Sequence, residues 1–257
     1  MSHFKLLPKP SKRIIPKCGM SKVGRMALGL RQVPDIGMWA LDSGISTCVW
    51  QTEACKNCYN KKTVVYPHMA ACWGEGGLDD RRWAAATSKG FCGLHRVRLN
   101  TRGDAFPNIR QVDRVASWVS DNPHTKFWIV TRAWQTGMHG SPEKWYRLNT
   151  GMMKAIEDRI MIYNNAYVEA SIDDWTGHHW ETLRDHGWNT MYYSHDNAMH
   201  PALGKDGANV VKCRKTWDLL PHPTRKGYHI HRKGVCRTCR NGCFNENRVD
   251  VWLKFHW

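Results

Sequence analysis

The sequence lacks the long apolar segments that secretion or membrane insertion requires. Residues 1–17 are basic and polar and contain prolines, where a secretory leader would carry an apolar stretch. Elsewhere in the 257 residues no run is both long and apolar enough to cross a bilayer. We therefore expect neither a secreted protein nor a membrane partner, and the expected location is the cytoplasm, where thiols stay reduced.

Acidic residues are also scarce. The chain has 22 Asp and Glu against 38 Lys and Arg, which gives a formal net charge of +16. An excess of this size is typical of proteins that contact polyanions, most often nucleic acid. Some of the 14 tryptophans adjoin arginines, as in 81–83 and 132–134. Such pairs suit single-stranded nucleic acid, although the ordinary role of any one Trp is to fill the core. We expect nucleic acid or another polyanion as a partner.

Internal repeats and low-complexity tracts are absent as well, so the organisation has to be taken from local composition. The length suits one large domain, or a domain plus a small module. Residues 1–35 form a basic, proline-containing arm, expected to lie on the domain or to be partly disordered. Residues 36–212 carry a regular pattern of elements, and residues 213–257 are rich in His, Pro, Cys and basic side chains. We predict three parts with these boundaries.

The middle part alternates candidate strands with candidate helices. The strands are 36–41, 95–100, 126–130, 167–171, 189–194 and 209–212, and the helices are 79–88, 109–120, 175–186 and one that begins at Ser141. Residues 64–71 are ambiguous. Alternation of this kind predicts an α/β fold with a parallel sheet and right-handed crossovers. With about six βα units, fewer than a closed barrel needs, we expect a partial (β/α)6-like barrel.

Three cysteines follow the first candidate strand in the pattern Cys48-x6-Cys55-x2-Cys58. Thiolates are soft ligands, and two Cys separated by two residues can hold one metal or one edge of a cluster. Three ligands on one loop would leave one iron of a 4Fe-4S cluster open. A disulfide framework is the alternative, but disulfide-dense chains are usually shorter and secreted. We predict a reactive metal site on this loop.

A second group of cysteines lies near the end of the chain, at Cys213, Cys236, Cys239 and Cys243. Four cysteines close a site, so we expect a structural centre here, either a second cluster or zinc. His222, His229 and His231 are competing zinc ligands, although each is expected to be a solvated loop residue. The other cysteines, Cys18, Cys72 and Cys92, show no paired spacing and are expected to be ordinary buried thiols.

Three segments together resemble the "gene product 88" domain family of phages and actinobacteria. They are Thr47-Cys48 to Cys58-Tyr59, then Arg98-x4-Gly103-Asp104, then Phe127-Trp-Ile-Val-Thr131-Arg132. The layout is similar to that of radical S-adenosylmethionine (SAM) enzymes, which have a partial βα barrel, three cysteines after the first strand and, in some cases, an auxiliary C-terminal cluster. Those enzymes typically have Cys-x3-Cys-x2-Cys, whereas the first gap here is six residues.

The resemblance implies a phage-encoded iron-sulfur protein in the cytoplasm of an infected host, with SAM bound to the open iron. It implies that Gly103 and Asp104 contact the SAM amino group, that Arg132 pairs with the SAM carboxylate or a substrate phosphate, and that Ser171 and Asp173 bind the ribose. The substrate would be a nucleic acid or a nucleotide-related molecule. The alternative is a non-enzymatic regulator that binds nucleic acid or RNA polymerase. In that case the metal sites are structural, and Asp104 and Arg132 form an ordinary ion pair.

Overall fold

The structure of the chain is a computed structural model. The residues that the structure describes are 19–33, 38–52, 54–55, 77–137, 146–194, 210–213, 219–221, 229–231, 243 and 250–254. Among them, no helix combines the length and the apolar character that a membrane span requires.

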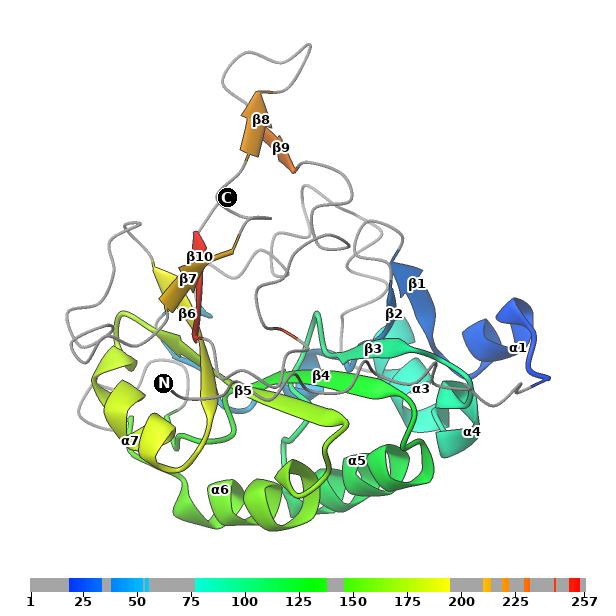
Figure 1. The fold of residues 1–257 in the computed structure, drawn as a ribbon, viewed down its shortest axis with the longest axis horizontal. Coiled ribbons are helices and arrows are strands. Elements are labelled where there is room, and N and C mark those ends of the chain that lie inside the picture. The colour runs from blue at the N-terminus through cyan, green and yellow to red at the C-terminus, as the bar shows by residue number, and fades with distance from the viewer. Residues whose placement is uncertain are drawn as a thin grey trace, which may run out of the picture.

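An open eight-stranded sheet forms the centre of the protein, in the order β1-β2-β3-β4-β5-β6-β10-β7 (Figure 1). Its strands are β1 (Arg31–Val33), β2 (Met38–Leu41), β3 (Arg96–Leu99), β4 (Lys126–Thr131), β5 (Ala166–Asp173), β6 (Asn189–Ser194), β7 (Val210–Lys212) and β10 (Asp250–Lys254). Only β1 is antiparallel to its neighbour, and the other pairs in this sheet are parallel. The predicted α/β class with a mostly parallel sheet is therefore confirmed. A separate hairpin pairs β8 (Leu219–Pro221) with β9 (His229–His231).

Strands β2 to β6 lie side by side in chain order, so each crossover moves to the next position in the same direction. Right-handed crossovers then place the connecting helices on one face of the sheet. Figure 1 shows α5, α6 and α7 together on that face, below the curved sheet. The helices are α1 (Lys22–Ala27), α3 (Leu78–Ala85), α4 (Ser88–Phe91), α5 (Ile109–Asp121), α6 (Thr150–Ile156) and α7 (Trp180–Asp185). A π-helical turn, η6 (Glu157–Met161), continues α6, and the 3-10 turns η2 (Ile45–Thr47) and η7 (Gly177–His179) precede the Cys48 loop and α7.

Most of the predicted elements lie where the pattern put them. The predicted strands of the middle part correspond to β2–β7, and the predicted helices 79–88, 109–120 and 175–186 correspond to α3, α5 and α7. In α5 the helical spacing holds, because Val112, Val115 and Val119 are all buried. The helix start at Ser141 and the ambiguous segment 64–71 lie outside the described residues.

Both of the predicted terminal parts contain described elements. Residues predicted as an arm contribute α1 and β1, and the buried Arg25 of α1 donates a 2.8 Å hydrogen bond to the carbonyl of Gly90. Residues predicted as a separate C-terminal module contribute β10, which lies between β6 and β7 with parallel pairing on both sides. Both terminal regions therefore belong in part to the central sheet.

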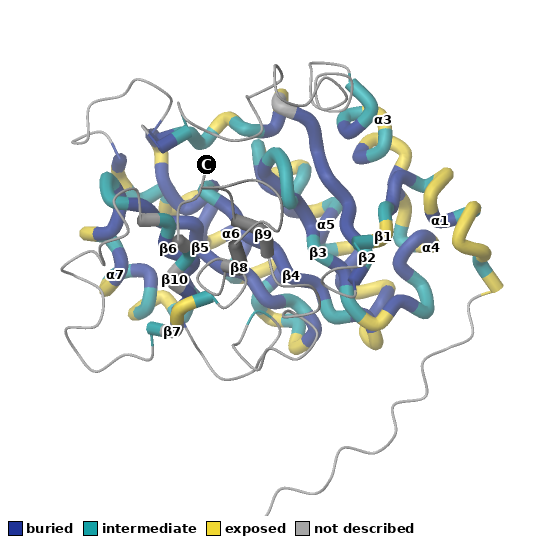
Figure 2. The backbone as a smooth tube through the Cα atoms, turned by 90° about the horizontal axis from the view of Figure 1, so that it is seen from above, coloured by how far each residue is buried: buried dark blue, intermediate teal, exposed yellow. Residues whose placement is uncertain are grey.

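Each face of the sheet has its own set of buried side chains, as the alternation of a pleated strand requires. The helix-side face carries Val97, Leu99, Phe127 and Ile129, which pack with the helices in one large core. The opposite, inner face carries a smaller apolar cluster of Met38, Trp128, Val130 and Met191. Figure 2 shows the central strands as buried and the exposed residues gathered on elements such as α1.

The tryptophans that adjoin arginines in the sequence belong to the core. Trp83 is 5% exposed and Trp134 is fully buried. The indole nitrogens of both are used inside the protein, with Trp83 donating to Gln111 and Trp134 donating to the carbonyl of Ser171. Neither ring can therefore stack on a nucleobase in this fold. Both rings fill the core, which is the ordinary role expected for a single Trp.

Candidate functional site at the carboxyl edge of the sheet

The carboxyl ends of β2, β3, β4 and β5 meet at one edge of the sheet because these neighbouring strands are parallel. Open α/β sheets bind their ligands at this edge. The loops that leave the four strands are unusually polar for a buried region. Two linked clusters of charged residues form there, one beyond β2 and β3 and the other beyond β4 and β5.

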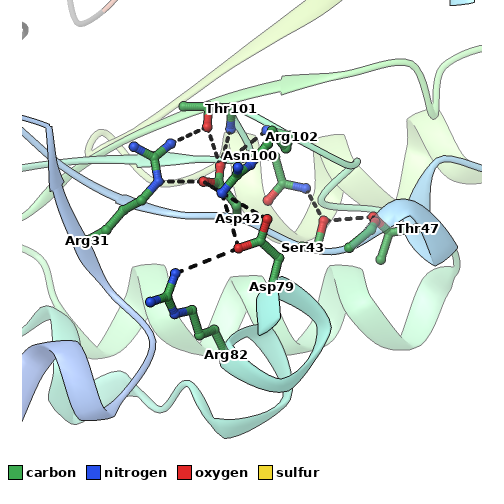
Figure 3. Close-up of polar contacts among 10 residues, drawn as sticks. Arg31, Asp42, Ser43, Thr47, Asp79, Arg82, Asn100, Thr101 and Arg102 are labelled. Atoms are coloured by element: carbon green, nitrogen blue, oxygen red, sulfur yellow. Dashed lines mark hydrogen bonds and ion pairs between the residues drawn. The ribbon is translucent and has the colours of Figure 1, made fainter. Parts of the chain in front are cut away.

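The first cluster centres on Asp42, the residue directly after β2 (Figure 3). The Asp42 carboxylate accepts a 2.7 Å hydrogen bond from Arg31 Nε and a 2.6 Å bond from the backbone N–H of Thr101. Arg102 lies between two acids, with Nη2 3.5 Å from Asp42 Oδ2 and 2.9 Å from Asp79 Oδ2. We call Arg31, Asp42, Asp79, Thr101 and Arg102 the Asp42 cluster.

The two acids of this cluster have pKa values that shift in opposite directions. Burial alone would raise the pKa of Asp42, but the charge of Arg31, hydrogen bonds from Arg31 and Thr101, and the charge of Arg102 together hold it below its ordinary value. Burial raises the pKa of Asp79 to about 6, because attraction to Arg102 and Arg82 does not offset desolvation and the nearby charge of Asp42. Asp42 is thus ionised at neutral pH, whereas Asp79 changes its charge in mildly acidic solution.

A line of small polar groups connects this cluster to the second one. Asn100 Nδ2 donates to Ser43 Oγ at 2.6 Å, Ser43 Oγ lies 2.7 Å from Thr47 Oγ1, and the backbone N–H of Asp104 donates to Thr47 Oγ1 at 2.9 Å. Gly103 sits against these hydroxyls with φ +77°, and a Cβ there would lie 2.3 Å from Ser43 Oγ. Only glycine fits this approach, which gives Gly103 a clear structural role.

Asp104 joins the loop after β3 to the end of β4. Its carboxylate accepts hydrogen bonds from Thr131 Oγ1 at 2.7 Å, the backbone N–H of Arg132 at 2.8 Å and the backbone N–H of Phe106 at 2.9 Å. Burial raises the pKa of Asp104 above its ordinary value, although these three donors oppose the change. The carboxylate is therefore surrounded by donors from the protein itself.

Arg132 then connects β4 and β5 to the cysteine loop. Its Nη1 donates to Asp173 Oδ2 at 2.6 Å and to Thr52 Oγ1 at 2.7 Å. Thr52 in turn donates its backbone N–H to Cys55 Sγ at 3.5 Å. Burial alone would lower the pKa of Arg132, but the charges of Asp173 and Cys55 raise it above its ordinary value. We call Thr52, Cys55, Arg132 and Asp173 the Arg132 cluster.

Four of the residues predicted from the sequence thus come together, namely Cys55, Asp104, Arg132 and Asp173. Ser171 lies on β5 two positions before Asp173, on the same face, and is 6% exposed. Cys48 follows η2 on the same loop as Cys55, and its carbonyl accepts a hydrogen bond from Gln51. Cys58 lies outside the described residues.

The C-terminal cysteines are described only in part. Cys213 directly follows β7, and Cys243 packs against the inner-face apolar cluster. Cys236 and Cys239 lie outside the described residues, as do Cys18, Cys72 and His222. His229 and His231 belong to β9, and Cys92 follows α4 and is half-buried. Within the described ranges, no three His, Cys, Asp or Glu side chains are grouped to hold a metal ion.

Several residues of the site were not predicted. Asp42 directly follows the predicted strand 36–41, so the strand-end rule that indicated Asp104 could also have found it. Thr52 lies between Cys48 and Cys55 and could have been flagged by that position. Arg31 and Asp79 gave no such signal, because neither follows a predicted strand and each enters the cluster through contacts that form only in the folded protein.

Comparison with known proteins found no matching family model, no matching curated protein and no matching solved structure. The likeness of the sequence to the "gene product 88" family therefore stays a prediction, and the function has to be argued from the site.

The opposite pKa shifts of Asp42 and Asp79 predict opposite effects of isosteric substitution. Asp42→Asn leaves Arg31 and Arg102 without their shared anion and should lower the free energy of unfolding by about 3 kcal/mol at pH 7. The loss should grow as pH rises from the lowered folded-state pKa to the unfolded-state pKa and stay level above it, because only the wild type gains from ionisation in that interval. For Asp79, whose folded pKa is raised, ionisation weakens the fold between pH 4 and 6. The free energy of unfolding of Asp79→Asn should therefore rise by about 3 kcal/mol relative to that of the wild type between pH 4 and 6, and the difference should stay constant above pH 6.

Urea denaturation at several pH values measures both effects. Asp113→Asn is the matched control, because Asp113 is 59% exposed in its pair with Arg159 and should change stability by less than about 0.5 kcal/mol. Parallel pH profiles for the Asp42 and Asp79 variants would contradict the assignment of different charge states.

Proposed function

We propose that the protein is an iron-sulfur enzyme in which Cys48, Cys55 and Cys58 hold a 4Fe-4S cluster, with SAM as the second cofactor and a nucleic acid or nucleotide as the substrate. In this proposal the curved sheet is a partial (β/α)6-like barrel, and its carboxyl edge is the reactive end. The observation that carries the proposal is the position of Cys55, whose sulfur lies at that edge beside Thr52 and Arg132.

The surroundings of Cys55 fit a ligand thiolate. The backbone N–H of Thr52 is directed at the sulfur and the Arg132 guanidinium lies close by, an electropositive setting that suits a sulfur that binds a metal. Hydrogen bonds to cluster sulfurs are also one of the means by which proteins tune such centres. Arg132 is itself held by Asp173, so the positive charge beside Cys55 has a defined place.

When bound, the cluster would deliver an electron to the sulfonium of SAM. The residues of the chain would position the reactants: Asp173 and Thr52 hold Arg132 Nη1, which leaves the rest of the guanidinium for a carboxylate or phosphate. Asp104 has three internal donors on its carboxylate, so we propose that it positions Arg132 through the backbone instead of contacting the SAM amino group. Ser171 remains a candidate for the ribose. The Asp173 carboxylate is fully buried and already accepts from Arg132, Thr52, Trp175 and Thr176, so we propose that it positions Arg132 instead of contacting the ribose.

The C-terminal cysteines would form a second, structural centre. Cys213, Cys236, Cys239 and Cys243 supply the four thiolates that either zinc or a second cluster needs. A centre that links Cys213 to Cys243 would brace the segment between β7 and β10, the two strands that pair with each other in the sheet. Such a brace has a structural purpose even without chemistry at the first site.

The alternative is a non-enzymatic regulator that binds nucleic acid or RNA polymerase. The net charge of +16 favours it, and so does the internal pairing of the acids and arginines at the carboxyl edge, which needs no ligand. With Trp83 and Trp134 in the core, charge and not these rings would supply the affinity.

The first test is metal content. After anaerobic preparation, each of three variants should lose the iron and sulfide of one centre, namely Cys48→Ala, Cys55→Ala and Cys58→Ala. The reason is that two remaining protein thiolates are too few to hold the cluster. Iron or zinc at the C-terminal centre should remain. Cys92→Ala is the control and should keep the full metal content. Iron and sulfide unchanged in all three variants would exclude this centre.

A second test separates the enzyme from the regulator. If one iron is open, SAM should change the EPR spectrum of the reduced cluster, because its amino and carboxyl groups become ligands of that iron. Methylthioadenosine, which lacks those groups, is the matched control and should leave the spectrum unchanged. A spectrum that does not respond to SAM would indicate a closed, structural cluster.

The net charge gives a third prediction. Binding to a single-stranded oligonucleotide, measured by fluorescence anisotropy, should weaken about 300-fold or more between 50 and 200 mM salt if six or more phosphates are neutralised. Duplex DNA of equal length is the comparison. Affinity that does not change with salt, or no binding at 50 mM salt, would show that the positive charge serves another purpose.

A further inference from the structure

One acidic side chain stands apart from the carboxyl-edge clusters, on the inner face of the sheet. Glu169 lies in the middle of β5, is 1% exposed, and has the apolar cluster of Met38, Trp128, Val130 and Met191 on the same face of the sheet. Isolated carboxylates are rarely left in such surroundings without a partner. A buried carboxyl group of this kind needs partners for both of its oxygens.

Only one oxygen of Glu169 is satisfied. Trp128 Nε1 donates to Oε2 at 2.8 Å, whereas the buried Oε1 has no hydrogen-bond partner among the described residues. Burial raises the pKa of Glu169 to about 8, against the opposing effects of the Trp128 hydrogen bond and the charge of Arg98. The carboxyl group is therefore mostly protonated at neutral pH. Because Oε2 accepts from the indole, the proton belongs on Oε1, which makes Oε1 a hydrogen-bond donor with no acceptor.

A second unused donor lies across Trp128. Arg98 on β3 is directly opposite Trp128 in the sheet, and its guanidinium carbon is 4.3 Å from the centroid of the indole ring. In the part of the chain that the structure describes, the Arg98 side chain has no ion pair or hydrogen bond, and its Nε is buried without a partner. Arg31, Arg102 and Arg132, by contrast, are each paired with a carboxylate.

We propose that the inner face of the sheet binds the oxyanion of a small ligand, a carboxylate or a phosphate, which accepts hydrogen bonds from Glu169 Oε1 and the guanidinium of Arg98. Arg98 is half-buried, so an anion reaches it from solvent, and Glu169 lies deeper. The site does not depend on a metal centre at the cysteine loop, and neither result of the metal tests decides it.

The chemistry of the two groups selects the class of ligand. A protonated acid and a guanidinium present donors and one positive charge, so the ligand has to supply acceptors and negative charge. A metal cation would be repelled by Arg98 and would find no ionised carboxylate. A nucleobase cannot stack on the ring face of Trp128 that Arg98 covers. Carboxylate and phosphate share the required oxyanion, and separate titrations distinguish them.

The test uses the indole N–H of Trp128 as a local probe. In 15N spectra of the full chain, with the Trp128 resonance assigned from Trp128→Phe, inorganic phosphate and acetate are titrated separately at pH 7. We expect one of the two anions to shift the Trp128 resonance saturably. The bound anion contacts Arg98, which covers the indole ring, and Glu169, which accepts the hydrogen bond from the indole N–H. The other tryptophan resonances report whether each variant remains folded.

The variants assign the shift to the two donors. Arg98→Met keeps the apolar stem over Trp128 and removes the charge, so the saturable shift should be lost. Arg110→Met, on the exposed surface of α5, removes the same charge elsewhere and should bind as the wild type does. Glu169→Gln keeps an acceptor for Trp128 and a donor at the Oε1 position, and should retain binding.

A pH series gives a readout that a merely structural role would not produce. In the wild type the affinity should fall as pH rises past 8, when Glu169 becomes an anion, and in Glu169→Gln this fall should be absent. Among the described residues, the other ionisable groups on this face or acting on Glu169 lie on six strands. They are Arg31 on β1, Arg96 and Arg98 on β3, Lys126 on β4, Tyr167 and Asp173 on β5, Tyr193 on β6, and Asp250 on β10. A response at Trp128 that survives Arg98→Met, or no saturable response to either anion, would overturn the proposal.

Discussion

The buried ion pair between Arg132 and Asp173 is the interaction on which the carboxyl edge depends. It joins the end of β4 to the end of β5, and through Thr52 it also holds the loop that carries Cys55. The Asp173 side chain is fully buried and the Arg132 side chain is only 16% exposed, and charges removed from water to this extent are tolerable only as a close pair with satisfied hydrogen bonds. Because the two strands are parallel neighbours, their ends deliver both charges to the same place. The parallel pairing of β4 and β5 thus determines that Arg132 and Asp173 meet at this edge.

The two polar regions of the protein differ in how completely their charges are compensated. At the carboxyl edge, Arg31, Arg102 and Arg132 face Asp42, Asp79 and Asp173, and the carboxylate of Asp104 is surrounded by donors. On the inner face, Arg98 and Glu169 share Trp128 but leave donors unused. A compensated network maintains a structure, whereas unused buried donors indicate where a ligand belongs. The edge therefore positions the cysteine loop, and the groups without partners on the inner face are those for which we propose an anionic ligand.

Local sequence patterns predicted much of the sheet because its central strands are short buried runs between amphipathic helices, as in 126–130 and 109–120. The strand-end rule also brought Asp104, Arg132 and Asp173 to one edge. The position of β10 could not be predicted, because its insertion between β6 and β7 depends on pairing between remote segments. Glu169 could not be singled out either. Its place in an alternating strand predicts a face, but the burial that changes its charge arises only when the neighbouring strands assemble.

We expect the Arg132–Asp173 pair to hold the cysteine loop against the sheet. Hydrogen exchange of peptides that cover residues 47–55 tests it most directly, in the wild type and in Asp173→Asn. We expect faster exchange in this loop when the Asp173 charge is removed, while peptides from β4 and β5 stay protected by their ladder hydrogen bonds. Exchange of residues 47–55 that is unchanged by Asp173→Asn, with the fold intact, would contradict it.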